Sequence, residues 1–161
     1  RTRRVEWRLE AKTGATTRGT LDHLRRAEPG EFDVAVTALG VNDVIAGVRR
    51  EEWLADQRRL RELLRSRYGV QLAVVSGFPP VHAFPALPQP LRWYLGRRCR
   101  ELDVEHRAIV DAEAGARFLP LDFVDDVAAM ADDGFHPGPE VYRAWGRAVA
   151  EVVEASLQTA H

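Results

Sequence analysis

The chain has 161 residues, of which 45% are hydrophobic, so it can bury one sizeable core and we expect a single domain over residues 1–161. Its 23 basic and 24 acidic residues give a net charge of -1, which provides no overall electrostatic footprint for nucleic acid or an anionic membrane. The lone cysteine, Cys99, excludes an intramolecular disulfide framework, and no apolar run reaches the roughly 18 residues that span a bilayer.

The first two predicted elements are a strand and a short helix. In VEWRLEA, apolar residues alternate with charged or polar ones, which predicts a strand over residues 4–11 with one buried face. After the turn KTGATT, Leu21, Leu24 and Ala27 recur at helical spacing, and the following Pro-Gly pair ends that pattern.

Two buried strands and a helix follow. FDVAVTAL, residues 32–39, is a nearly continuous apolar run rich in β-branched residues, which is typical of a central strand covered on both faces. Residues 51–68 carry an apolar stripe that predicts a helix, and Gly69 supplies its C-terminal stop. The run VQLAVVS, residues 70–76, predicts the next strand.

The second half of the chain continues the alternation. A proline-rich loop leads into a long predicted helix over residues 91–113, and ARFLPL at 116–121 indicates the last strand. The terminal helix is expected to begin near Pro139, where a proline fits the first helical position. Strands that alternate with helices through short connections predict an α/β domain with a mostly parallel sheet.

Three glycine-containing turns follow predicted strands along the chain. They are KTGATT, LGVNDV and DGFHPG, and together they supply an exposed backbone N–H, an amide side chain, a carboxylate and an imidazole. In an open parallel sheet, ligands bind outside the carboxyl ends of the strands, so these turns are the candidate functional residues.

The turn DGFHPG has the parts of a general base. Asp133 lies three residues before His136, so its carboxylate can reach the ring Nδ1–H and leave Nε2 to accept a proton. Pro137 keeps His136 out of the α-helical conformation. An asparagine amide and a glycine N–H at the same sheet edge can donate to the oxygen that gains charge in a tetrahedral intermediate, as acyl transfer requires.

With these three turns, the chain resembles the SGNH hydrolases, also called GDSL esterases and lipases. The glycine block of that family is seen as Gly14, its G-x-N-D block as Gly40, Val41, Asn42 and Asp43, and its D-x-x-H-P block as Asp133, Gly134, Phe135, His136 and Pro137. All three occur in the family's order and after the expected strands, and the resemblance covers the whole chain.

The resemblance implies a fold, a chemistry and a role for each residue. It implies a flavodoxin-like three-layer α/β sandwich and a serine esterase that needs no metal or cofactor and acts on small acyl esters or lysophospholipid-like esters. Gly14 and Asn42 would be oxyanion donors, His136 the base and Asp133 its orienting partner. The subclass of ester, whether acyl ester, thioester or acetylated sugar, stays open, as does the oligomeric state.

The nucleophilic serine of the family is missing from the expected place. It belongs to a G-D-S block before the glycine block, whereas the thirteen residues before Gly14 contain no serine. In the family's sheet, the strand that carries this block lies centrally, between the strands predicted at 4–11 and 32–39. We therefore expect that the chain is a fragment and that a segment before residue 1 supplies the serine and the first central strand, so that the fragment alone is inactive.

Other residues have simpler interpretations. Of the three serines, Ser66, Ser76 and Ser156, only Ser76 follows a strand, but VVSGF lacks the G-x-S-x-G pattern and a structural hydroxyl is the better reading. The carboxylates of DFVDDVAAMADD, residues 122–133, have no His or Cys at ligand spacing and are read as a solvated turn rather than a metal site. His82 is a candidate pocket residue; His23, His106 and His161 have no partner motif.

Two alternatives stay open. The segment FPPVHAFPALPQPLRWYLG either forms a wall for an acyl chain or apolar leaving group, or simply packs on the core. The domain as a whole is either an esterase or a non-catalytic binding domain that kept the hydrolase scaffold after losing its nucleophile. The single cysteine permits a reducing compartment, and we expect a cytoplasmic protein.

Overall fold

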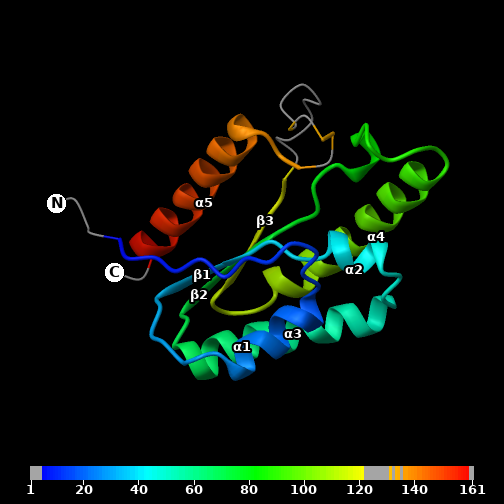
Figure 1. The fold of residues 1–161 in the computed structure, drawn as a ribbon. Coiled ribbons are helices and arrows are strands. Elements are labelled where there is room, and N and C mark those ends of the chain that lie inside the picture. The colour runs from blue at the N-terminus through cyan, green and yellow to red at the C-terminus, as the bar shows by residue number, and fades with distance from the viewer. Residues whose placement is uncertain (1–4, 122–130, 132, 135, 160–161) are drawn as a thin grey trace.

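The fold is an α/β arrangement around a parallel sheet, as a computed structural model shows (Figure 1). The structure describes residues 5–121, 131, 133, 134 and 136–159. Within these residues the sheet has the order β1-β2-β3, formed by Val34–Thr37, Leu72–Ser76 and Ala116–Leu119. Both strand pairs are parallel, so the predicted α/β class and sheet direction are confirmed.

The helices lie where the apolar spacing predicts them. They are α1 (Thr17–Arg26), α2 (Val41–Ile45), α3 (Arg50–Tyr68), the 3-10 turn η1 (Val81–Ala83), α4 (Leu91–Asp111) and α5 (Pro139–Thr159). The short α2 and η1 were not predicted, because five and three residues are too few to show a helical period. None of the helices among the described residues is long and apolar enough to cross a membrane.

Local signals explain where the helices begin and end. Thr16 caps α1, because its Oγ1 accepts a hydrogen bond from the Gly19 N–H at 3.1 Å. Helix α3 ends at Gly69, which has a φ of 66° and so adopts the left-handed conformation that a side chain would disfavour. The Gly69 N–H returns to the Leu64 carbonyl. These caps fix the lengths of the two helices that pack on one another.

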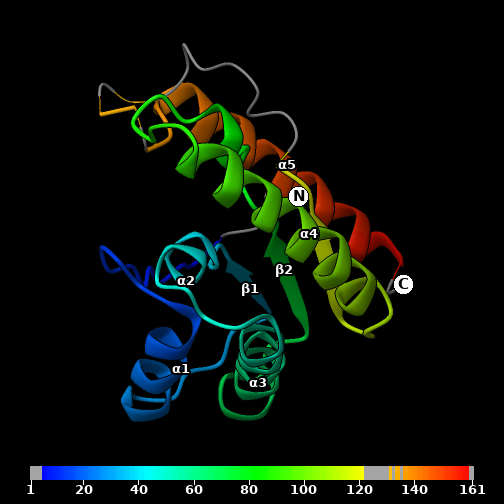
Figure 2. The same cartoon turned by 90° about the vertical axis from the view of Figure 1, so that its right-hand side faces the viewer.

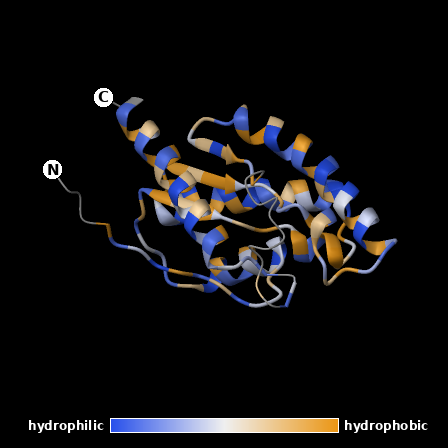
Figure 3. Ribbon diagram, turned by 90° about the horizontal axis from the view of Figure 1, so that it is seen from above, coloured by the Kyte–Doolittle hydropathy of each residue, from blue (hydrophilic) through white to orange (hydrophobic). Residues whose placement is uncertain are grey.

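One face of the sheet packs against α3 and α4. Because side chains alternate along a strand, the register places Ala35, Val75 and Phe118 on the same face. Ala35 packs against a buried cluster shared by α1 and α3, and Val75 packs against Val110 of α4, which is fully buried. The apolar strands stand out as orange between helices of mixed hydropathy in Figure 3.

The other face is covered by α5 at β2 and β3, but less completely at β1. Helix α5 contacts both β2 and β3, and the Trp145 indole N–H donates to Ser76 Oγ at 3.0 Å. On the same face, Val36 of β1 is 44% exposed. Figure 2 shows α5 and α4 at the β3 end of the sheet and α1 and α3 near β1. In the described sheet, β1 is therefore an edge strand, not the covered central strand that the sequence predicts.

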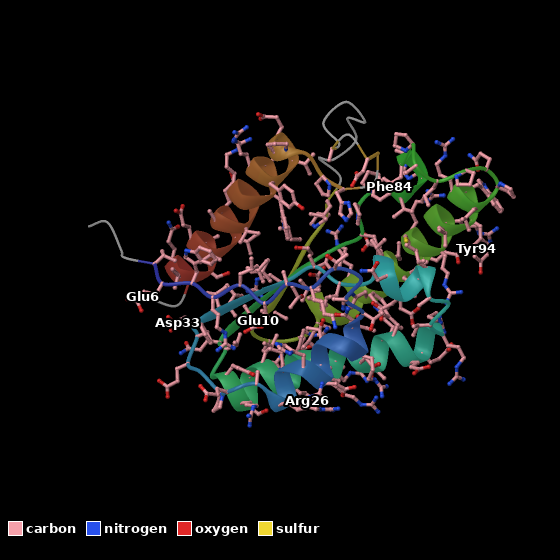
Figure 4. All side chains as sticks on the ribbon, in the orientation of Figure 1. Glu6, Glu10, Arg26, Asp33, Phe84 and Tyr94 are labelled. Atoms are coloured by element: carbon pink, nitrogen blue, oxygen red, sulfur yellow. The ribbon has the colours of Figure 1, made fainter. Side chains whose placement is uncertain are left out.

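The predicted strand over residues 4–11 is wrong for the residues that the structure describes, 5–11. These residues are extended but form no strand, and Figures 1 and 4 show them as a plain trace on which Glu6 and Glu10 lie. Arg8 stacks over the Phe32 ring at 5.0 Å, and Glu10 pairs with His23 of α1 at 2.9 Å. A strand needs a hydrogen-bonding neighbour, and β1 does not pair with this segment. Its alternating apolar side chains are consequently exposed: Val5 by 79%, Trp7 by 79% and Leu9 by 71%.

A buried charged group joins α3 to α4. Arg61 is 1% exposed, and its Nε–H donates to Glu113 at 2.8 Å. A second guanidinium nitrogen donates to the Gln57 carbonyl at 3.1 Å and lies 3.2 Å from His106 Nε2. Because arginine only donates, His106 Nε2 must accept, which fixes the ring as the neutral tautomer protonated on Nδ1.

The surroundings of His106 keep the ring uncharged. The ring is 3% exposed and packs edge-on against Trp53 and Phe118. Burial, together with the neighbouring Arg61 charge, lowers the pKa of His106 from 6.5 to about 3. Protonation of His106 in the folded state is therefore strongly unfavourable.

This lowered pKa predicts a loss of stability in mild acid. Below pH 6.5 the unfolded chain protonates His106 while the folded chain does not, so the free energy of unfolding falls as the pH drops towards 3. The slope from this group is up to about 1.4 kcal/mol per pH unit. When the free energy of unfolding is measured by urea denaturation at several pH values, its slope against pH should be shallower for His106→Gln than for wild type. His23→Gln, which removes an exposed histidine, is the matched control, and equal slopes for the two variants would contradict the prediction.

Candidate active site

Gly40, the first residue of the G-x-N-D block, occupies a position that only glycine fits. It follows β1 with a φ of 142°, a backbone conformation that side chains disfavour. A Cβ there would lie 2.6 Å from the Phe78 ring and 3.1 Å from Trp53. Its carbonyl accepts from the Val44 N–H at 2.9 Å, which opens α2. The glycine thus turns the chain sharply and brings Asn42 and Asp43, the second and third residues after it, to the sheet edge.

Asn42 connects α2 with the Gly14 turn. Its Nδ2 donates to the Ala15 carbonyl at 2.9 Å, which holds the amide against the residue that follows Gly14. An amide nitrogen carries two protons, so one N–H remains for a ligand. Gly14 is exposed, has a φ of 73°, and its N–H makes no hydrogen bond within the part of the chain that the structure describes. The structure therefore brings Gly14 and Asn42 together and leaves each with a donor.

The buried side chain of Asp43 holds this arrangement in place through hydrogen bonds with Thr17. Both carboxylate oxygens accept from the Thr17 N–H at 3.0 Å. The Thr17 hydroxyl donates to the same carboxylate at 3.0 Å and itself accepts from Gln57 Nε2 at 3.0 Å. Burial raises the pKa of Asp43, and the hydrogen bonds from Thr17 oppose that rise. The carboxylate also lies at the positive end of α1, which favours its charge.

The hydrogen bonds that join Asp43, Thr17 and Gln57 were only partly predictable from the sequence. Asp43 belongs to the G-x-N-D block, and in the structure it accepts a hydrogen bond from the Thr17 N–H at the start of α1. The roles of Thr17 and Gln57 were missed. Thr17 lies close to Gly14 in the sequence, which was a usable signal, whereas Gln57 reaches the site from α3 and carries no local signal.

Asp133 and His136 form the hydrogen-bonded pair that their spacing predicts. Asp133 Oδ2 lies 2.6 Å from His136 Nδ1, and Asp133 Oδ1 accepts from the His136 backbone N–H at 2.9 Å. One carboxylate therefore holds both the ring and the backbone of the histidine. Both side chains are exposed, at 60% for His136 and 51% for Asp133. A ring bound through Nδ1 directs its Nε2 away from the carboxylate.

The loop that carries this pair is closed on itself and rests on the loop before α4. The Ala131 N–H donates to the His136 carbonyl at 2.8 Å, and the Gly134 N–H donates to the Ala131 carbonyl at 2.9 Å. The Ala86 N–H reaches the Gly134 carbonyl at 3.3 Å. Phe135 of the motif and residues 122–130 of the acidic stretch lie outside the described residues.

Each serine of the chain has a structural role. Ser76 is 4% exposed, and its Oγ accepts from the Trp145 indole, as expected of a hydroxyl at the end of a buried strand. Ser66 Oγ donates to the Glu62 carbonyl at 2.8 Å, and Ser156 Oγ donates to the Val152 carbonyl at 2.9 Å. Ser76 is therefore poorly placed to attack a substrate.

The proline-rich loop both packs on the core and lines a pocket. Val81 and Phe84 are buried, at 2% and 3% exposed, which fits the packing interpretation. A pocket of about 300 Å³ lies beside the carboxyl ends of β2 and β3, and its lining includes Phe78, Pro79, His82, Arg100, Asp103 and Leu121. The Phe78 N–H donates to Asp103 Oδ1 at 2.9 Å, and burial raises the pKa of Asp103. His82 is thus a pocket residue, as the sequence suggests.

A comparison of the sequence with protein families identifies the family to which the chain belongs. The model of the GDSL-like lipase/acylhydrolase family matches residues 1–144. The chain belongs to this family. Membership supports hydrolase activity in general terms and leaves the substrate open.

Solved structures of the GDSL type share the fold. A GDSL-like lipase from Bacteroides thetaiotaomicron superposes with a TM-score of 0.69 at 16% identity, over 89% of this chain and 73% of that one. The psychrotrophic esterase EstA from Pseudoalteromonas sp., in a structure inhibited by monoethylphosphonate, gives a TM-score of 0.62 at 16% identity, over 90% and 74%. None of the curated proteins matches the sequence significantly.

The constraint on Gly40 predicts opposite effects for two glycine substitutions. Gly40→Ala should destabilise the protein by about 2–5 kcal/mol, because the new methyl group overlaps Phe78 and the backbone is strained. Gly146→Ala lies in α5, where a Cβ meets nothing within 4 Å, and should stabilise the protein by about 0.5–1 kcal/mol. Thermal and urea unfolding measure both, and a neutral Gly40→Ala would disprove the steric argument.

Proposed function

We propose that the full-length protein hydrolyses carboxylic esters through an acyl-enzyme, with His136 as general base and Asp133 as its orienting partner. The observation that carries the proposal is the 2.6 Å contact between Asp133 Oδ2 and His136 Nδ1. A carboxylate in this position holds the imidazole in one tautomer and stabilises the imidazolium that forms when the ring takes a proton.

The oxyanion donors in this proposal are the Gly14 N–H and the Asn42 amide. The hydrogen bond from Asn42 to Ala15 and the Asp43 brace keep the two donors at a fixed separation before a substrate arrives. Preorganised donors stabilise a developing oxyanion without a reorganisation cost, and one such donor typically contributes about 10²–10³ in kcat.

The reaction follows from these roles. A serine hydroxyl attacks the ester carbonyl and passes its proton to His136 Nε2, and the resulting oxyanion accepts from Gly14 and Asn42. His136 then gives the proton to the departing alcohol, which leaves an acyl-serine. Water, deprotonated by His136 in its turn, releases the carboxylic acid and regenerates the serine. The chemistry needs no metal or cofactor.

The nucleophile in this proposal lies in a segment before residue 1. Ser66, Ser76 and Ser156 are all engaged in structural hydrogen bonds, and the family places its serine ahead of the glycine block. A segment that carries a strand would complete the protein where its surface is most incomplete. That place is the edge of β1 opposite β2, which is unpaired within the described sheet, together with the partly exposed face around Val36.

Two features support docking at β1. The edge of β1 opposite β2 is unpaired within the described sheet, and unpaired strand edges bind other strands readily. Apolar side chains are also exposed: Val36 on β1, and Trp7 and Leu9 in the N-terminal segment. A strand placed between the N-terminal segment and β1 would pair both edges and bring its carboxyl end beside Gly14 and Asn42.

The proposed substrates are small acyl esters or lysophospholipid-like esters. The 300 Å³ pocket beside Phe78 offers apolar and cationic side chains close to the same sheet edge. An acyl chain or apolar leaving group would pack against Phe78 and Leu121.

Removal of the base should abolish turnover while the fold persists. In the full-length protein, His136→Ala should lower kcat for p-nitrophenyl esters by at least about 10²–10⁴-fold, and Asp133→Asn should also lower kcat, with KM little changed. His23→Gln is a matched control, because His23 also pairs with a carboxylate, Glu10, at 2.9 Å. Near-normal turnover by His136→Ala would refute the assignment.

Covalent labelling separates the esterase from a non-catalytic binding domain. EstA was solved with monoethylphosphonate as inhibitor, and a fluorophosphonate should label the full-length protein at a serine before residue 1. Labelling should persist in Ser76→Ala and fall sharply in His136→Ala. Ser76→Ala should nonetheless cost about 1 kcal/mol of stability, because the Trp145 indole loses its acceptor. A full-length protein that no phosphonate labels would favour the binding domain.

A further inference from the structure

Three large apolar side chains are exposed together at the start of α4. Leu91 is 45% exposed, Trp93 56% and Tyr94 52%, within the first four residues of the helix. Ile45 of α2, a helix in contact with α4, is 50% exposed. Figure 4 shows Tyr94 at the outer edge of the molecule. We call these four residues, with the arginines described next, the α4 surface.

The α4 surface is basic although the chain as a whole is not. Residues 63–100 contain no aspartate or glutamate, and the last nine of them hold four arginines: Arg92, Arg97, Arg98 and Arg100. The Arg97 guanidinium lies 5.9 Å from the centre of the Trp93 ring, and Arg98 lies 3.5 Å from the Tyr94 hydroxyl. The net charge of -1 therefore conceals a local concentration of positive charge next to exposed aromatic rings.

The acidic residues around this surface do not cancel its charge. Glu101 pairs with Arg97 at 2.8 Å, and Glu105 pairs with Arg50 at 2.8 Å. Arg98 reaches the Val48 carbonyl, so the start of α3 is close, and there Glu51 and Glu52 lie beside Arg49 and Arg50. Arg50 thus serves both Glu51 and Glu105, and Asp103, which lines the pocket with Arg100, accepts from the Phe78 N–H. Among the described residues, Arg92, Arg98 and Arg100 form no ion pair with a carboxylate.

We propose that the α4 surface binds the surface of an anionic lipid bilayer. Tryptophan and tyrosine rings favour the boundary between headgroups and acyl chains, and arginines favour the negative potential of anionic headgroups. Leu91 and Ile45 supply apolar area that would enter the boundary.

The surface adjoins the candidate site on both sides. Ile45 belongs to the same five-residue helix as Asn42. The loop that carries Asp133 and His136 contacts Ala86, and the chain from Ala86 leads directly into Leu91. A molecule adsorbed through the α4 surface would hold its candidate site close to the membrane, where acyl esters of lipids are found. The binding itself rests on the exposed residues and not on ester hydrolysis.

Vesicle binding by the full-length protein tests the proposal. Co-sedimentation should be at least about tenfold stronger with vesicles of phosphatidylglycerol and phosphatidylcholine in equal parts than with phosphatidylcholine alone, and high salt should weaken it. The double variant Trp93→Ser/Tyr94→Ser should lose about tenfold in affinity. Arg97→Gln should lose up to about fivefold, as expected for one arginine near an anionic surface.

Matched controls keep the test specific. Val104→Ser removes an apolar side chain that is 74% exposed further along α4, and Arg25→Gln removes an arginine that pairs with Asp22 on α1 as Arg97 pairs with Glu101. Both should bind anionic vesicles as wild type does. Equal binding to both kinds of vesicle, or an equal loss in the controls, would overturn the proposal. So would a wild-type dimer in sedimentation velocity that Trp93→Ser/Tyr94→Ser converts to monomers, since a second copy would then cover the surface.

Discussion

The buried carboxylate of Asp43 is the constraint on which the candidate site depends. It accepts three hydrogen bonds from Thr17 and so joins the start of α1 to the turn after β1. The hydrogen bond from Asn42 to the Ala15 carbonyl adds a second link between the Gly14 turn and the turn after β1. A buried charge is costly unless it is fully hydrogen-bonded, so this contact favours one geometry for the turns that carry the two proposed oxyanion donors. The position of these donors is therefore a property of the fold and not of a flexible loop.

Most of the fold was predictable because its signals are local. The helical stripe of α3 with Gly69 at its end and the apolar run of β2 each need only a short window of sequence. The strand expected at 4–11 failed for a physical reason: alternation says which side chains a strand would bury, but a strand forms only beside a partner. The same reasoning accounts for β1. Its apolar run predicts a strand covered on both faces, but Val36 is 44% exposed in the structure.

In the candidate site, too, contacts between residues close in the sequence could be predicted, and contacts between separate elements could not. The pairing of Asp133 with His136 spans three residues, so it could be inferred from spacing and the structure contains it. The link between Gly14 and Asn42 required the sheet to bring two turns together, and the resemblance to a family supplied what spacing alone could not. The brace through Gln57 depends on how α3 packs against α1 and the turn after β1, and no short motif encodes that contact. Burial and hydrogen-bond partners across elements are what the sequence leaves undetermined.

Two exposed apolar regions of this molecule call for different occupants. At β1 the edge that is unpaired within the described sheet exposes backbone N–H and C=O groups, which another strand can pair and lipid chains cannot. At α4 the backbone is already hydrogen-bonded within the helix, and what remains exposed is aromatic, aliphatic and guanidinium surface. Such a surface gains from contact with headgroups and acyl chains without any backbone pairing. The two proposed occupants therefore differ in chemistry: a polypeptide strand suits the backbone edge of β1, and a lipid surface suits the exposed side chains of α4.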